Sequence, residues 1–281
     1  MPQSCISTDS RFEREKIILL SAVLHSEEHR LVSIEDDWGT IFIVEEDNYR
    51  ALKFDEIYEQ SKMDVLKTHY PVFEYTKAML LGVALCPFRD VLLLGLGGGS
   101  LVRTLHYIEP DASLTVVEIR PAVIELAFQY FALPASPSLN LVCQDALYYV
   151  CEQCMQVDLI FSDLFWAMQM NPAQSSINFI EGCHRQLRPH GWLIVNYEQK
   201  ADIDDELVNA LYRYFEDVLV CYIPNGNAVV LAGSLEKSGG MQGFYQRLPS
   251  LEARLNCKMD SLGRSLQRAP HHPGHLTNNK R

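Results

Sequence analysis

The stretch Val91-Leu92-Leu93-Leu94-Gly95-Leu96-Gly97-Gly98-Gly99 joins an unbroken apolar run to four glycines within five positions. Such a run predicts a strand that is buried on both faces of a parallel sheet. Glycines at the end of the strand let the backbone approach a ligand closely. The stretch therefore predicts a parallel sheet that ends in a nucleotide-binding loop, and a tight turn with close helix packing is the alternative interpretation.

A second predicted strand, 114–118, ends in Glu118, which lies 21 positions after Gly97. In nucleotide-binding α/β folds, about 20 residues separate the glycine loop from the carboxylate that takes the ribose hydroxyls. The strict fingerprint has a third glycine where this chain has Ser100, so the match is incomplete. We predict an adenosine-type cofactor site made by the residues Gly95, Gly97, Gly98, Gly99 and Glu118.

From residue 90 onward, apolar strands alternate with helical segments, which predicts a parallel sheet covered on both faces. An Asn-Gly turn at 225–226 joins two later apolar runs and predicts an antiparallel hairpin. Together these patterns predict an α/β fold with a doubly wound, mostly parallel sheet of seven strands, the class I methyltransferase-like Rossmann fold. The predicted strands are 91–94, 114–117, 139–142, 157–161, 192–195, 218–223 and 228–232.

Upstream of the glycines, short strands at 30–35, 40–44 and 49–54 predict a small N-terminal β-meander, and 70–85 has helical spacing. We divide the chain into an N-terminal helix and β-meander region (1–80), a Rossmann-like cofactor-binding domain (81–235) and a C-terminal extension (236–281). The last fifteen or so residues are rich in His, Pro and Gly, and we predict that they are disordered.

A net charge of −12 over 281 residues argues against general nucleic-acid binding, which needs a basic surface. The N-terminus lacks a signal-peptide pattern, and no stretch approaches the ~18 apolar residues that cross a bilayer. We therefore expect a cytoplasmic protein without a nucleic-acid or membrane partner. Cys151 and Cys154 form the only Cys-x-x-Cys pair, and without further ligands at suitable spacing they predict no metal site.

Two further carboxylates follow predicted strands, at the edge where ligands of open α/β sheets bind. Asp145 precedes a helix, so it is either an acceptor for an adenine amino group or an N-cap. Asp163 ends the apolar strand 157–161 and is the candidate general base.

The segments 94–99, 116–124, 144–146, 158–163 and 179–189 resemble the polyamine aminopropyltransferases, the spermidine synthases, and the resemblance runs from about residue 30 to 233. It implies decarboxylated S-adenosylmethionine as the cofactor and a small-molecule amine as the acceptor. It also implies that Glu118 binds the ribose and Asp145 the adenine, while Gln60 faces the cofactor. Asp163 would then be the base that takes a proton from the attacking amine. The oligomeric state stays open, with a homodimer as one option.

The chain departs from the family pattern at two positions, since Ser100 and Trp166 stand where the family has aspartates. The loss of two charge-assisted contacts, at ~1.5–3 kcal/mol each, predicts poor use of putrescine or spermidine and an acceptor with fewer charges or an aromatic surface. Glu74 or Glu198 are alternative acids that would restore a polyamine site. A methyltransferase that uses ordinary S-adenosylmethionine and a cofactor-binding protein without turnover are the competing hypotheses.

Overall fold

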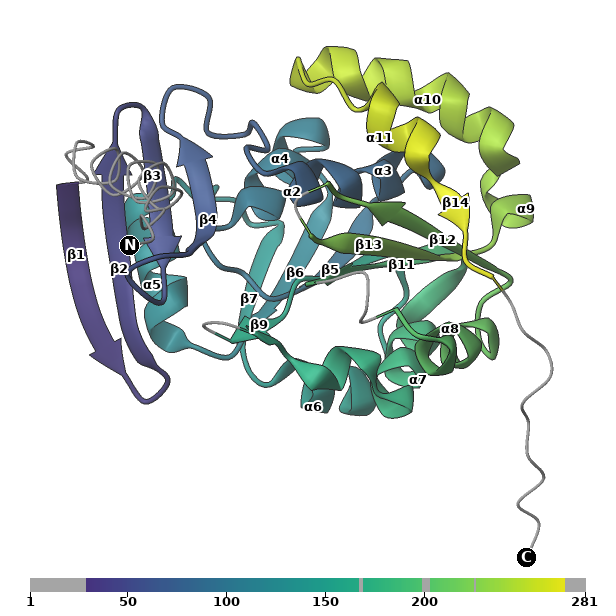
Figure 1. The fold of residues 1–281 in the computed structure, drawn as a ribbon, viewed down its shortest axis with the longest axis horizontal. Helices are drawn as coiled ribbons and strands as arrows, with labels where there is room; N and C mark the ends of the chain where they lie inside the picture. Colours follow the sequence, from purple (N-terminus) through teal and green to yellow (C-terminus); the bar gives the residue numbers. More distant parts are fainter. Residues whose placement is uncertain (1–28, 167–168, 199–202, 225, 271–281) are drawn as a thin grey trace, which may run out of the picture.

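A central sheet of eight strands contains the apolar run that precedes the glycines (Figure 1). The structure is a computed structural model that describes residues 29–166, 169–198, 203–224 and 226–270. In order across the sheet, the strands are β14 (Gln267–Arg268), β12 (Asp217–Tyr222), β13 (Ala228–Gly233), β11 (Leu187–Tyr197), β8 (Val157–Ser162), β5 (Asp90–Leu94), β6 (Ser113–Glu118) and β7 (Leu139–Cys143).

Strand directions confirm the predicted fold class. β7, β6, β5, β8 and β11 pair in parallel, whereas β13 pairs antiparallel with both β11 and β12. The sheet has one strand more than the seven predicted, because β14 pairs with Leu219 and Val220 of β12. The prediction of disorder is therefore wrong for 267–270, since the backbone groups of an edge strand can pair whatever the side chains are. Residues 271–281 lie outside the described part.

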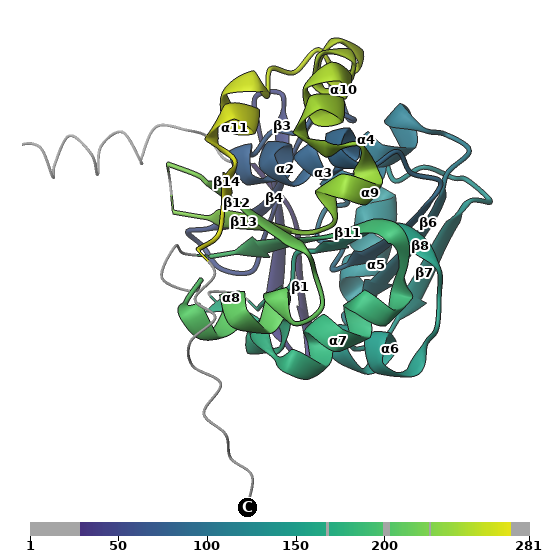
Figure 2. The same cartoon turned by 90° about the vertical axis from the view of Figure 1, so that its right-hand side faces the viewer.

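Helices cover both faces of the sheet (Figure 2). Successive residues of a strand point to opposite faces, so apolar strands need cover on both. Val91 and Leu93 of β5 belong to one core cluster, and Leu92 and Leu94 belong to the other. The first cluster is covered by α2 (Glu74–Met79), α3 (Leu81–Leu85), α4 (Ser100–Ile108), α5 (Pro121–Tyr130), α9 (Leu235–Ser238), α10 (Gly240–Leu255) and α11 (Asp260–Ser265). The second is covered by α6 (Ala146–Glu152), α7 (Ile177–Gln186) and α8 (Asp205–Tyr212).

The predicted helix 70–85 is shorter than expected and consists of two helices, α2 and α3, that meet at Leu80. It begins only at Glu74, because Phe73 has an extended backbone with φ of −79° and ψ of 143°. The proposed domain boundary at residue 80 stays a prediction, and α2, which ends beside it, contacts β11 and β13 of the large sheet. Among the described helices, none has the length and apolar character needed to span a bilayer.

The β-meander lies beside the large sheet, at the left of Figure 1. Its strands pair antiparallel in chain order: β1 (His29–Asp36), β2 (Gly39–Glu46), β3 (Tyr49–Lys53) and β4 (Glu59–Asp64). The sequence predicted the first three but missed β4, whose sequence Glu-Gln-Ser-Lys-Met-Asp has only one apolar residue. Two arginines tie the meander to the rest of the fold: Arg50 donates to the Tyr130 carbonyl (2.6 Å), and Arg120 pairs with Asp36 (2.7 Å).

Candidate active site

A cavity of about 770 Å³ opens between the meander and the carboxyl ends of the parallel strands. Six of the eight predicted site residues line it: Gln60, Gly95, Gly97, Glu118, Asp145 and Asp163. Gly98 and Gly99 are not among the lining residues. The cavity is thus where open α/β sheets bind their ligands.

The glycine loop needs its glycines for conformation and for packing. Gly97 and Gly99 have φ of 51° and 72°, which are costly for other residues. A Cβ on Gly98 would lie 2.7 Å from the Ser61 hydroxyl oxygen and 2.9 Å from the Phe131 ring. Gly95 and Gly97 line the cavity, whereas Gly98 allows β4 and Phe131 to pack closely behind the loop, so the nucleotide-binding role stays a prediction.

Arg103 of α4 lies buried behind the glycine loop and joins three segments of the chain. Its guanidinium donates to the carbonyls of Thr68 (2.6 Å), Phe131 (2.8 Å) and Gly98. Burial lowers the pKa of Arg103 to about 9, which still leaves it charged at neutral pH. Its Nη2 has no hydrogen-bond partner within the described part of the chain.

Glu118 ends β6 and is held by backbone groups. Its Oε2 accepts from the Leu96 N–H and its Oε1 from the Arg120 N–H, each at 2.9 Å. Burial raises the pKa of Glu118, and these two N–H groups oppose part of that rise. Each carboxylate oxygen has a second lone pair, so hydroxyl groups of a ligand in the cavity can still bind here.

Asp145 is the N-cap of α6, where its Oδ1 accepts from the Tyr148 N–H at 2.9 Å. The helix-cap interpretation is therefore confirmed. It does not exclude ligand binding, because Asp145 also lines the cavity and has a second oxygen. Gln60 reaches the same cavity from β4.

Asp163 follows β8 and is held by side chains from distant segments. The Asn196 amide at the end of β11 donates to its Oδ1 at 2.9 Å, and the Tyr75 hydroxyl on α2 is a further donor. Asn227 in turn donates to the Asn196 oxygen at 3.1 Å. Burial raises the pKa of Asp163 to about 6, although both donors favour the ionised form. A carboxylate with this pKa is ionised at neutral pH and can accept a proton.

Sequence reasoning missed Asn196 and Asn227, which both line the cavity. The signal for Asn196 was a polar residue in the apolar strand Ile194-Val195-Asn196-Tyr197. Nothing local marks Asn227, because its role depends on the fold of the β12–β13 hairpin. Tyr75 lies in the predicted helix 70–85, where helical spacing marks it only as an apolar residue.

The cavity is acidic. Ser100, the first residue of α4, lines it, and so does Glu198, whereas Glu74 does not. Trp166 belongs to the short strand β9 (Phe165–Trp166), which pairs with β10 (Gln169–Met170), but its side chain lies outside the described part. Five carboxylates line it: Glu59, Glu118, Asp145, Asp163 and Glu198. Lys62 pairs with Glu59 at 2.9 Å, and the other four favour a cationic ligand. Arg120 is the only cationic residue among the described lining residues, and Asp36 neutralises it.

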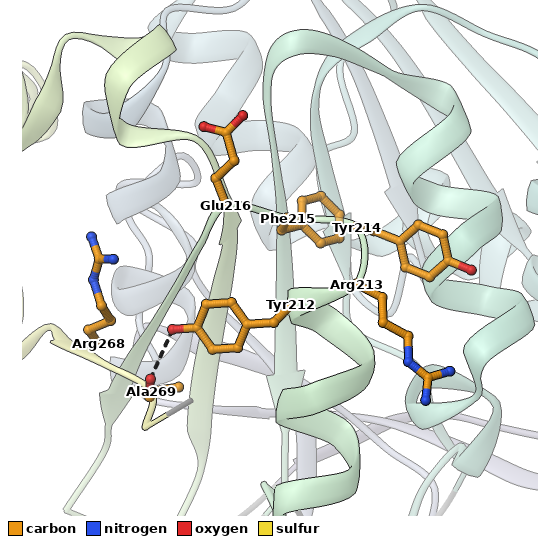
Figure 3. Close-up of a pocket in the computed structure, with 7 residues that line it drawn as sticks. All are labelled: Tyr212, Arg213, Tyr214, Phe215, Glu216, Arg268 and Ala269. Atoms are coloured by element: carbon orange, nitrogen blue, oxygen red, sulfur yellow. Dashed lines mark hydrogen bonds between the residues drawn. The ribbon is translucent and has the colours of Figure 1, made fainter. Parts of the chain in front are cut away.

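A second hollow, of about 460 Å³, is lined by residues at the end of α8, before β12 and in and just after β14 (Figure 3). Tyr212 donates there to the Ala269 carbonyl at 2.9 Å. It contains none of the predicted site residues. Cys151 and Cys154 are exposed thiols, and no group of three or more His, Cys, Asp or Glu side chains in the described ranges is arranged to hold a metal ion.

Comparison with known proteins supports the fold, although no protein-family model matches the chain. A spermidine synthase solved with the transition-state analogue AdoDATO superposes with a TM-score of 0.64, at 18% identity over 84% of this chain and 83% of the other. Human methyltransferase-like protein 13, solved with SAH, gives 0.59, at 23% identity over 73% and 98%. These likenesses confirm the class I methyltransferase-like fold.

One sequence relative is more informative about the family. The polyamine aminopropyltransferase of Chromobacterium violaceum is 30% identical over 242 residues, which cover 83% of this chain and 92% of the relative. The chain therefore belongs to the polyamine aminopropyltransferase family.

Proposed function

We propose that this protein transfers an aminopropyl group from decarboxylated S-adenosylmethionine to an amine, with Asp163 as the general base. The observation that carries the proposal is the position of Asp163, with its pKa of about 6, in the same cavity as Glu118 and Asp145. One end of the cavity thus suits a nucleoside, and the other suits an amine that must lose a proton.

In this reaction the sulfonium of the cosubstrate supplies an electrophilic carbon and leaves as a neutral thioether. The residues of the chain supply position and proton transfer. Glu118 binds the ribose hydroxyls and Asp145 the adenine, with Gln60 facing the cofactor. Asp163 accepts one proton from the amine nitrogen as the new C–N bond forms and the C–S bond breaks, so the atoms and charges balance. Tyr75 and Asn196 hold the Asp163 carboxylate toward that nitrogen.

The family name alone does not identify the acceptor. The departures at Ser100 and Trp166 predict an acceptor with fewer charges than spermidine, whereas Glu198 provides one carboxylate that a diamine could use. Purified protein is to be assayed with decarboxylated S-adenosylmethionine and with putrescine, spermidine or a monoamine, and methylthioadenosine is measured. We expect the monoamine to be used best. Efficient spermidine formation from putrescine would contradict this order, and Glu198→Gln would then show whether that carboxylate binds the diamine.

Methyl transfer from ordinary S-adenosylmethionine is the second candidate. It is supported by the uncharged Ser100 at the cavity wall, where the family pattern has an aspartate, and by the likeness to a methyltransferase-like protein solved with SAH. Calorimetric titration with both cofactors separates the two. Tighter binding of the decarboxylated form by tenfold or more is expected, and tighter binding of the ordinary form would favour methyl transfer instead.

A further inference from the structure

Trp38 is a large aromatic side chain at the tip of the β1–β2 turn. It is 47% exposed and lines the main cavity. Exposed apolar surface is common on proteins, but an aromatic side chain left open inside a cavity marks a ligand contact. Its counterpart at the next turn, Tyr49, is 40% exposed and does not line the cavity.

The turn that carries Trp38 is fixed to the loop after Glu118. The Asp36 Oδ1 accepts both the Trp38 N–H (2.9 Å) and the Arg120 Nη2 (2.7 Å). Arg120 also donates to the Gly39 carbonyl at 2.8 Å, and its guanidinium lies 4.5 Å from the centre of the Phe54 ring. The side chains of Arg120 and Asp36 are only 7% and 17% exposed. This ion pair therefore holds the turn in place, so little freedom is lost when a ligand binds.

These contacts place Trp38 at the Glu118 end of the cavity, because Arg120 follows Glu118 by two residues. Ile119, which lies between them, is 36% exposed and also lines the cavity. Asp163 is held by different elements, α2 and β11. A flat apolar group at the Glu118 end would have an aliphatic surface at Ile119 and an aromatic one at Trp38.

We propose that Trp38 is a wall of the nucleoside site, on which the adenine ring of the cosubstrate stacks. The ligand's identity rests on the proposed function, whereas the contact itself rests on the geometry of the turn. The meander thus takes part in binding the nucleoside that the Rossmann-like part holds by its ribose.

The test is calorimetric titration with methylthioadenosine of the wild type, Trp38→Ala, Trp38→Phe and Tyr49→Ala. Stacking of a base on an aromatic side chain is lost in Trp38→Ala, so we expect its Kd to rise about tenfold or more. Trp38→Phe should restore most of the affinity. Tyr49→Ala alters the neighbouring turn at similar exposure and should bind like the wild type. Thermal melting checks that each variant is folded.

The titration distinguishes failure of the proposed function from failure of the role proposed for Trp38. If the wild type binds neither methylthioadenosine nor S-adenosylhomocysteine, the proposed function fails and the nucleoside wall fails with it. If the wild type and Trp38→Ala bind methylthioadenosine equally, only the role of Trp38 is overturned. Equal weakening by Tyr49→Ala and Trp38→Ala would also overturn it, because the effect would then come from distortion of the meander.

Discussion

The two ends of the main cavity hold their carboxylates in different ways. Glu118 accepts hydrogen bonds from the backbone N–H groups of Leu96 and Arg120, which lie in the loops after β5 and β6. Asp163 is bonded by the side chains of Tyr75 and Asn196, which come from α2 and β11. Burial raises the pKa of both carboxyl groups, and the donors oppose part of that rise: backbone N–H groups at Glu118, and the Tyr75 and Asn196 side chains at Asp163. Fixed backbone donors suit the binding carboxylate that we propose at Glu118, and donors on separate side chains suit the proton acceptor that we propose at Asp163.

Neutralising Asp163 should have the largest effect. Asp163→Asn keeps the shape but cannot take the proton, and loss of a general base typically lowers the rate by ~10²–10⁴-fold. In the wild type, the rate should rise with pH through about 6, as Asp163 becomes ionised. Steady-state assays over pH 5–8 measure both effects, with the exposed Asp111→Asn as the control. Wild-type turnover in Asp163→Asn would exclude the role of base.

Neutralising Glu118 should instead impair binding. Glu118→Gln places an amide where one of two backbone N–H groups now finds an oxygen, and it removes a charged acceptor for the ribose. Hydrogen bonds to charged groups contribute ~1.5–3 kcal/mol, so the Kd for methylthioadenosine should rise roughly 10–100-fold. Glu125→Gln, on the exposed side of α5, is the matched control. Unchanged affinity with native thermal stability would show that Glu118 does not contact the nucleoside.

The same Asp163→Asn change should stabilise the folded chain at neutral pH. The pKa of Asp163 is about 6 in the fold, against an ordinary ~3.9 in the unfolded chain, so ionisation of the buried group costs stability as the pH rises from 4 to 6. The variant should therefore gain roughly 1–3 kcal/mol above pH 6 and nothing below pH 4. Denaturant unfolding at pH 4 and pH 7.5 measures this free energy. A variant that is equally destabilised at both pH values would show that ionisation of Asp163 does not destabilise the fold.

Removing one donor from Asp163 should have the smallest effect. Tyr75→Phe keeps the ring but removes the hydroxyl that favours the ionised carboxylate, so the pKa of Asp163 should rise further. The pH–rate profile should then move to higher pH, with a loss of severalfold at pH 7 that alkaline pH restores. Tyr70→Phe, on a tyrosine outside the cavity, provides the comparison. A uniform loss at every pH would indicate a packing role for Tyr75.

The two ends also differ in how far the sequence predicts them. The glycine loop, Glu118 and Asp145 lie at strand ends that the alternation of apolar runs and helices marks, so their meeting follows from the fold class. Asp163 could be predicted by the same argument, but the donors that set its basicity could not. Tyr75, Asn196 and Asn227 lie on three segments that only tertiary packing brings together. Strand β4 was missed for a related reason, since its polar residues line a cavity and cover the glycine loop, and no hydrophobic periodicity marks them.

Arg103 has a consequence for how the glycine loop becomes ordered during folding. Its guanidinium binds carbonyls at residues 68, 98 and 131, which belong to the segment after the meander, the loop and the end of α5. A cation buried before all three acceptors are in place would lack compensation, so the arginine favours their simultaneous assembly. Glycine residues lose more conformational entropy on folding than other residues do. The loop should therefore become rigid in the same cooperative step as the other two segments, and its amides should exchange hydrogen by global unfolding when Arg103 is present and by local opening when it is replaced.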